Sequence, residues 1–223
     1  MKIRRLLYQI DYYHILTFKD QYQDIVNSYF PFENLEYAID NENSINEQCR
    51  LIFKRENIAI VLSKQSLVFL FEGDVSDLKN QNGAIKIFWE IYEKIKGFKN
   101  YTKSTKHTIL ANAVDIKSEE IVNGILDNNK YFTINPFGKI EEFSCNYEFK
   151  EKEIAVKFSF GNYTEKDILK QDLIPFKTKF NEDLVNNVGL MSRIEVSEFE
   201  KIPSFSKFKT LLIKTEQFLS HFD

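Results

Sequence analysis

Five lysines close together are the residues whose type and spacing first suggest chemistry. The segment from Lys94 to His107 contains these five lysines and no acidic residue, although the whole chain has a net charge of −3. Lys94 and Lys96 follow a helical pattern and would lie in the last turn of the helix, where cations offset the helix dipole. Charged runs usually form a solvated surface. The helix end therefore accounts for these two lysines without any ligand.

The rest of this segment suggests an anion-binding site. Lysines that flank an exposed aromatic ring can contact phosphate groups and let a base stack on the ring. The candidate residues for binding an anion or a nucleic acid are Lys99, Tyr101, Lys103, Lys106 and His107. The alternative is a loop that only faces water, and the sequence leaves both interpretations open.

Catalytic and metal-binding patterns are missing from the sequence. His14, His107 and His221 lie outside any HExxH motif or Cys/His cluster, and Cys49 and Cys145 are far apart in the chain. The seven glycines form neither GxGxxG nor a P-loop. An active site would have to be gathered from distant residues such as His14, His107 and Cys145. We therefore expect a protein that is not an enzyme and that holds no metal or cofactor.

Composition limits the class of protein further. The chain has 223 residues, among them 21 Phe and 11 Tyr, which suits one domain with a large aromatic core. The negative net charge disfavours binding of nucleic acid through overall charge, so such binding would need a local patch. Two isolated cysteines are typical of a reducing compartment, and no apolar run is long enough to span a membrane. We expect a cytoplasmic protein with no membrane partner.

Hydrophobic periodicity predicts the elements that would position these residues. In the first part we expect one or two strands within residues 3–18, a helix over 22–30 stopped by Pro31, three antiparallel strands at 49–54, 58–63 and 67–71, and a helix over 84–98 capped by Asn82 and Gly97. The strands at 58–63 and 67–71 are apolar on both faces and should lie inside the sheet.

The second part of the chain repeats this order of elements. We expect a strand at 107–116, a short helix capped by Ser118, a hairpin at 144–149 and 154–160, a short helix capped at Thr164, a strand at 191–199, and a final amphipathic helix with an apolar stripe from Phe208 to Phe222. Adjacent strands with separate helices predict a single α+β unit over 1–223, with antiparallel sheet covered by helices. Two related halves, 1–103 and 104–223, are a hypothesis that rests on element order alone.

Several segments carry a family resemblance. They are YFPF at 29–32, IAIVLSKQSLVFLFEG at 58–73, IFWEIYEKI at 87–95, and the strand and helix from Arg193 to Phe222. Together they resemble a sporadically distributed family of small bacterial proteins of unknown function. The Arg–Tyr–Asn strand signature of that family is absent, because HTILANAVDI at 107–116 retains only Asn112. Sporadic distribution implies mobile elements and conflict with phage, and it implies no reaction or catalytic residues.

These observations lead to two functional hypotheses. The first is a non-enzymatic interaction or regulatory subunit of a bacterial defence or phage-conflict system, because aromatic residues are enriched at protein interfaces. Its partner would be another protein or further copies of the same chain. The alternative is a nucleic-acid or nucleotide-binding module that uses the lysine-rich patch.

Overall fold

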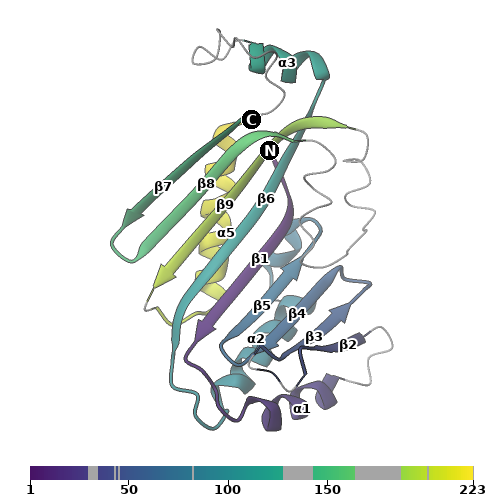
Figure 1. The fold of residues 1–223 in the computed structure, drawn as a ribbon, viewed down its shortest axis with the longest axis vertical. Coiled ribbons are helices and arrows are strands. Elements are labelled where there is room, and N and C mark those ends of the chain that lie inside the picture. Colours follow the sequence, from purple (N-terminus) through teal and green to yellow (C-terminus); the bar gives the residue numbers. More distant parts are fainter. Residues whose placement is uncertain are drawn as a thin grey trace.

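One antiparallel sheet organises the molecule (Figure 1). The computed structural model describes residues 1–29, 35–42, 44, 46–81, 83–127, 143–163, 187–199 and 201–222. Within them, nine strands follow the order β2-β3-β4-β5-β1-β6-β9-β8-β7, so that β1 is the central strand. The strands are β1 Lys2–Tyr12, β2 Leu35–Asp40, β3 Gln48–Phe53, β4 Ile58–Ser63, β5 Ser66–Phe71, β6 Ser104–Lys117, β7 Ser144–Glu151, β8 Ile154–Tyr163 and β9 Val188–Phe199.

The helices are separate from the strands in sequence. They are α1 Phe18–Tyr29, α2 Gly83–Lys96, α3 Glu119–Asp127 and α5 Phe205–Leu219, with two short 3-10 helices, η1 Val75–Lys79 and η3 Ser220–Phe222. In Figure 1, α2 and α5 lie behind the sheet and α3 lies at its upper end. The α+β class and the antiparallel sheet are therefore confirmed. No helix in the described part of the chain is long and apolar enough to cross a membrane.

The main core forms on the side of the sheet that carries the helices. Along β1, Leu6, Tyr8, Ile10 and Tyr12 are buried on this side, as the period-two alternation of a strand requires. The rings of Phe88 from α2 and Phe208 from α5 both pack against Tyr8, and all of these side chains belong to one core cluster. A smaller apolar cluster around Ala59 and Leu70 lies on the other side, which explains why β4 and β5 are apolar on both faces.

Strand pairing follows a similar order in residues 1–103 and in the described part of residues 104–223. In the first half, β1 pairs with β5, the last strand of the following meander. In the second half, β6 pairs with β9, which is again the last strand before a long helix. The first strands of the two halves, β1 and β6, pair with each other at the centre of the sheet. A duplication of one unit stays a prediction.

Most predicted elements are present, and the differences lie at an edge and in a turn. The sequence analysis missed the edge strand β2, although Leu35, Tyr37 and Ile39 alternate with Glu36, Ala38 and Asp40 as in a strand. β6 begins at Ser104, so the end of the lysine-rich segment is strand rather than loop. The predicted roles of Pro31, Asn82 and Thr164 lie outside the described residues. The cap at Ser118 is confirmed by a hydrogen bond from the Ile121 amide to Ser118 Oγ.

Candidate functional site

The lysine-rich segment spans the end of α2, a turn and the start of β6, and its first lysines have partners on neighbouring elements. Lys94 Nζ donates a hydrogen bond to Ser28 Oγ at 2.6 Å and lies 4.8 Å from the centre of the Tyr29 ring. Lys96 forms an ion pair with Glu93. These two lysines therefore hold the end of α2 and its contact with α1.

The last two residues of the candidate site point to opposite faces of the sheet. Lys106 forms an ion pair with Asp11 on β1, with 3.4 Å between Nζ and Oδ2. His107 is the next residue along β6 and its side chain is fully buried on the core side. Strand alternation separates them, so the structure does not bring His107 together with the surface lysines.

Between these residues, Lys99 and Lys103 remain at the surface. The turn that carries them is fixed to α1, because the Lys99 amide donates to Gln21 Oε1 at 2.7 Å. Lys103 Nζ lies 6.0 Å from the centre of the exposed Tyr13 ring. The Tyr101 hydroxyl lies 3.2 Å from that of Tyr92, in a half-buried position. Neither surface lysine has a carboxylate partner among the described residues. The turn therefore presents two cations, Lys99 and Lys103, beside the exposed ring of Tyr13.

On the face of the sheet opposite the main core, four described cations are paired with acids on neighbouring segments, which reduces the charge available for attracting phosphate groups. The ion pairs on this face are Arg5–Glu72, Arg50–Asp40, Lys54–Glu36 and Lys106–Asp11.

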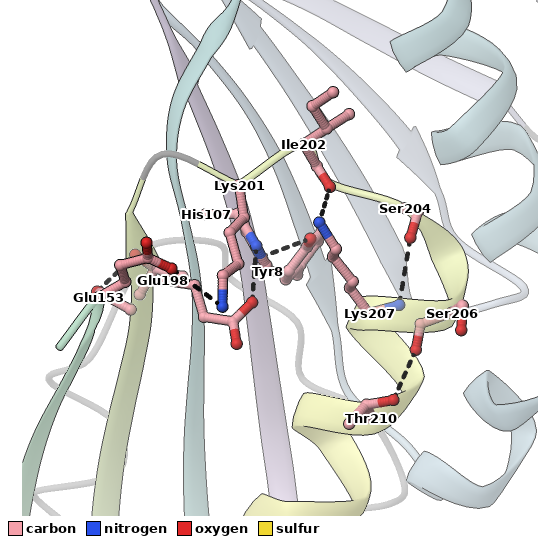
Figure 2. A network of polar contacts seen from close by, with 12 residues as sticks. Tyr8, His107, Glu153, Glu198, Lys201, Ile202, Ser204, Ser206, Lys207 and Thr210 are labelled. Atoms are coloured by element: carbon pink, nitrogen blue, oxygen red, sulfur yellow. Dashed lines mark hydrogen bonds and ion pairs between the residues drawn. The ribbon is translucent and has the colours of Figure 1, made fainter. Parts of the chain in front are cut away.

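A polar network lies inside the core beside the start of α5 (Figure 2). The Tyr8 hydroxyl is 3.1 Å from His107 Nδ1, and His107 Nε2 is 3.1 Å from Glu198 Oε2. A carboxylate can only accept, so the histidine proton is assigned to Nε2 and Tyr8 donates to Nδ1. β1, β6 and β9 each contribute one residue, and the network therefore crosses the junction between the two halves.

Burial controls the protonation of this network. It lowers the pKa of His107 below its ordinary value of 6.5, because the charged imidazolium loses water; the Glu198 carboxylate opposes this effect, and Lys207 reinforces it. Burial also raises the pKa of the Tyr8 hydroxyl well above its ordinary value. Both side chains are therefore neutral at pH 7.

Charged residues around Glu198 connect the network to the surface. Lys201 forms an ion pair with Glu153 in the turn between β7 and β8, with 3.1 Å between the charged atoms. Lys207 Nζ donates to the Ile202 carbonyl at 2.8 Å. Ser204 caps α5 by accepting from the Lys207 amide. In Figure 2 these contacts follow the chain from the end of β9 into α5, so they fix the start of this helix.

The network has the groups of a proton relay, but it is packed inside the core. The Tyr8 ring is fully buried and is packed by Phe88, Trp89 and Phe208. Two cavities, of about 630 and 480 Å³, lie on the described part of the chain, and neither is lined by His14, His107 or Cys145. A structural role for the network follows from this packing.

Sequence reasoning placed His107 at the surface and did not select Tyr8 or Glu198. The signal that could have found them is alternation: counting back by twos from the buried Ile109 puts His107 on the core side. In β1, Tyr8 lies on the same face of the strand as Leu6 and Ile10. Glu198 carried no such signal, because its burial depends on the segment that follows β9.

The network predicts a loss of stability in acid. Because burial lowers the pKa of His107 in the folded state, the unfolded chain binds more protons between that pKa and 6.5. The contribution of neutral His107 to the free energy of unfolding should be fully present above about pH 6.5. Below this value it should decrease by up to about 1.4 kcal/mol per pH unit as the pH falls. Urea unfolding between pH 5 and 8 measures this slope. His107→Gln, which cannot titrate, should have a smaller slope; an unchanged slope would contradict the assignment.

Comparison with known proteins assigns no family to this chain. No family model matches the chain, and no curated protein matches it significantly.

Proposed function

We propose that this protein is a non-enzymatic interaction subunit that binds another polypeptide along β7. The observation that carries the proposal is the exposure of this strand. β7 ends the nine-stranded sheet, and residues 144–150 are exposed on both of its faces. An edge strand of this kind presents unpaired backbone donors and acceptors to a further strand.

The side chains of β7 support the same proposal. Cys145, Tyr147 and Phe149, which we call the β7 ledge, alternate along the face that carries the main core. Tyr147 is 60% exposed and Phe149 is 50% exposed. Exposed aromatic residues of this size are enriched where proteins bind each other.

Packing of α5 explains why the ledge is left open. The Tyr147 ring stacks on Phe158 of β8 at 6.3 Å between centroids, and Phe158 in turn meets Phe218 of α5 at 5.0 Å. The helix thus reaches β8, while β7 lies beyond it at the edge of the sheet (Figure 1). A polypeptide added beside β7 would contact both the ledge and the free backbone.

The ledge predicts a binding defect without a folding defect. Tyr147→Glu combined with Phe149→Glu places two charges where a partner would bury aromatic rings, and we expect partner binding to fall at least tenfold. Because both side chains are largely exposed, the melting temperature should change little. Affinity capture from the native host, with bound proteins quantified by mass spectrometry, measures the defect.

The opposite edge of the sheet supplies the control for this experiment. Tyr37 on β2 is 49% exposed, so Tyr37→Glu introduces a similar charge on the other edge strand. This variant should retain its partners. Equal capture by the β7 double variant and the unmodified protein would contradict the proposal.

A second candidate function rests on the free cations of Lys99 and Lys103 beside Tyr13. Single-stranded nucleic acid could place phosphates on the lysines and a base on the ring. Lys99→Glu with Lys103→Glu should then abolish binding of a labelled oligonucleotide at low salt. Lys86→Glu with Lys214→Glu changes the net charge equally at a distance and should leave binding intact. An unmodified protein that binds no oligonucleotide at low salt would end this candidate.

A further inference from the structure

We infer that the polypeptide on β7 is a second copy of this chain, whose own β7 runs antiparallel around a two-fold axis at Tyr147. The inference rests on the proposed function and specifies its partner. It follows from the backbone of β7, the order of its side chains and its position at the end of the sheet.

Every second residue of β7 directs its backbone groups to solvent. Glu151 and Ile154 pair across the two-residue turn of the β7–β8 hairpin, and the pair that closes such a turn is hydrogen bonded. Alternation from Glu151 directs the backbone groups of the odd-numbered residues toward β8. The Phe143 amide agrees with this assignment, because it donates to Asn162 Oδ1 at 2.8 Å. Residues 144, 146, 148 and 150 therefore offer their N–H and C=O groups to a partner.

The edge also lacks the features that usually prevent pairing. β7 pairs with β8 without a register shift from Ser144 to Glu151, so no bulge twists the edge away. The strand contains no proline, and between residues 144 and 150 it carries one charge of each sign, Glu148 and Lys150; Glu151 at its end adds one negative charge. A regular edge of this length with little net charge favours pairing with another strand.

One register makes the strand complementary to itself. With Tyr147 opposite its own copy, residues 144–150 of the two chains overlap completely. On the open face, Asn146 lies opposite Glu148 and Ser144 lies opposite Lys150. On the ledge, Tyr147 meets Tyr147 of the second copy and Cys145 meets Phe149, so apolar residues contact apolar residues.

The neighbouring registers are less favourable. A two-fold axis at Glu148 places this carboxylate directly opposite its copy, and like charges in that position destabilise a pair. An axis at Phe149 moves Ser144 and Asn146 beyond the partner strand, because β7 ends at Glu151 and the turn begins. An axis at Asn146 leaves Phe149 and Lys150 without strand partners. Full overlap without a charge conflict occurs only around Tyr147.

The resulting assembly is a closed dimer. A two-fold axis makes the contact isologous, so the two β7 strands pair with each other. No free β7 edge then remains to propagate a fibre. Strand pairing of this length buries less than the roughly 1,600 Å² of a standard interface. We therefore expect monomer and dimer in equilibrium, with a dissociation constant on the order of micromolar.

Cysteine cross-linking of the full chain tests both the partner and the register. In a Cys145→Ser background, Tyr147→Cys places two thiols opposite each other, within the Cα separation of about 4.4–6.8 Å that a disulfide requires. Glu148→Cys places them roughly 8–9 Å apart, beyond that range. Under mild oxidation, non-reducing electrophoresis should show a covalent dimer for the first variant and a monomer for the second.

Asn146→Pro provides a second test that leaves the thiols untouched. It removes one outward N–H and no hydrogen bond to β8, so the fold should persist while self-association falls at least tenfold. Sedimentation velocity measures association, and a melt checks the fold. If the Asn146→Pro variant does not fold, the comparison of Tyr147→Cys with Glu148→Cys still tests the dimer and its register.

Three results would overturn the inference: a monomer at high micromolar concentration, a covalent dimer that forms equally at position 148, or a dimer that survives Asn146→Pro in a folded protein. The proposed function would survive each of them if the ledge double variant still lost a captured partner. Conversely, a ledge double variant that lost self-association but still captured other proteins would support a second copy as the partner on β7 and would count against the binding of other proteins there.

Discussion

Deletion of residues 204–223 should leave the remaining chain unfolded. This segment contains α5, whose Phe208, Leu211, Leu212 and Leu219 are at most 2% exposed. Burying one such side chain contributes about 1.5–3 kcal/mol, and a whole domain is stable by only about 5–15 kcal/mol. Removal of four of them costs about 6–12 kcal/mol, which is as large as the stability of a typical domain. Circular dichroism and thermal melts of the truncated chain, beside the full chain, measure the outcome.

Point substitutions within α5 measure how much single side chains of this helix contribute to stability. Phe208 is fully buried and its ring lies 4.9 Å from that of Tyr8, so Phe208→Ala should cost about 3–5 kcal/mol. The apolar stripe in the sequence suggests the same cost for Phe218. The structure corrects this expectation, because Phe218 is only half-buried, and we expect roughly half the cost there.

The alternative for α5 is that its stripe binds another subunit. In that case the truncated chain would melt cooperatively near the temperature of the full chain and would lose only its partner. The contacts of Phe208 with Tyr8 and of Phe218 with Phe158 occur within one chain, and they favour the core interpretation.

The sequence is informative about the fold where one face of an element is buried. The alternation in β1 and the stripes of α2 and α5 reproduce the observed burial, because a fixed period assigns each side chain to a face. The short edge strand β2 was missed although Leu35, Tyr37 and Ile39 alternate along it. The sequence carries no information on strand order: β9 lies beside β6 although the two are far apart in the chain.

The candidate site was less predictable than the fold. Composition drew attention to the lysines, yet Lys94 and Lys106 have partners that depend on how α1, α2 and β1 pack, and Lys96 pairs with Glu93 within α2. His107 changed from a surface candidate to a buried residue because it shares the core face of β6 with Ile109. The exposure of Tyr147 depends on where α5 ends its coverage, which no local pattern encodes.

The largest effect of a single charge should come from Glu72. This carboxylate lies on the face opposite the main core with a side chain 1% exposed, beside Arg5, which is 17% exposed. Arg5 Nε donates to Glu72 Oε1 at 2.7 Å. Breaking a buried ion pair by removing its carboxylate is strongly destabilising, so Glu72→Ala should cost about 3–5 kcal/mol of unfolding free energy.

An exposed pair on the same face shows what burial contributes. Lys54 and Glu36 also form an ion pair, but their side chains are 64% and 56% exposed. Glu36→Ala should therefore cost no more than about 1 kcal/mol. The pair Arg5→Met with Glu72→Leu removes both charges and fills the space with apolar atoms, so its stability should return to within about 1 kcal/mol of the parent. Urea unfolding of the four proteins measures these differences. A cost for Glu72→Ala no larger than that for Glu36→Ala would show that water reaches the pair, and a double variant as unstable as Glu72→Ala would show that the carboxylate matters for contacts other than the one with Arg5.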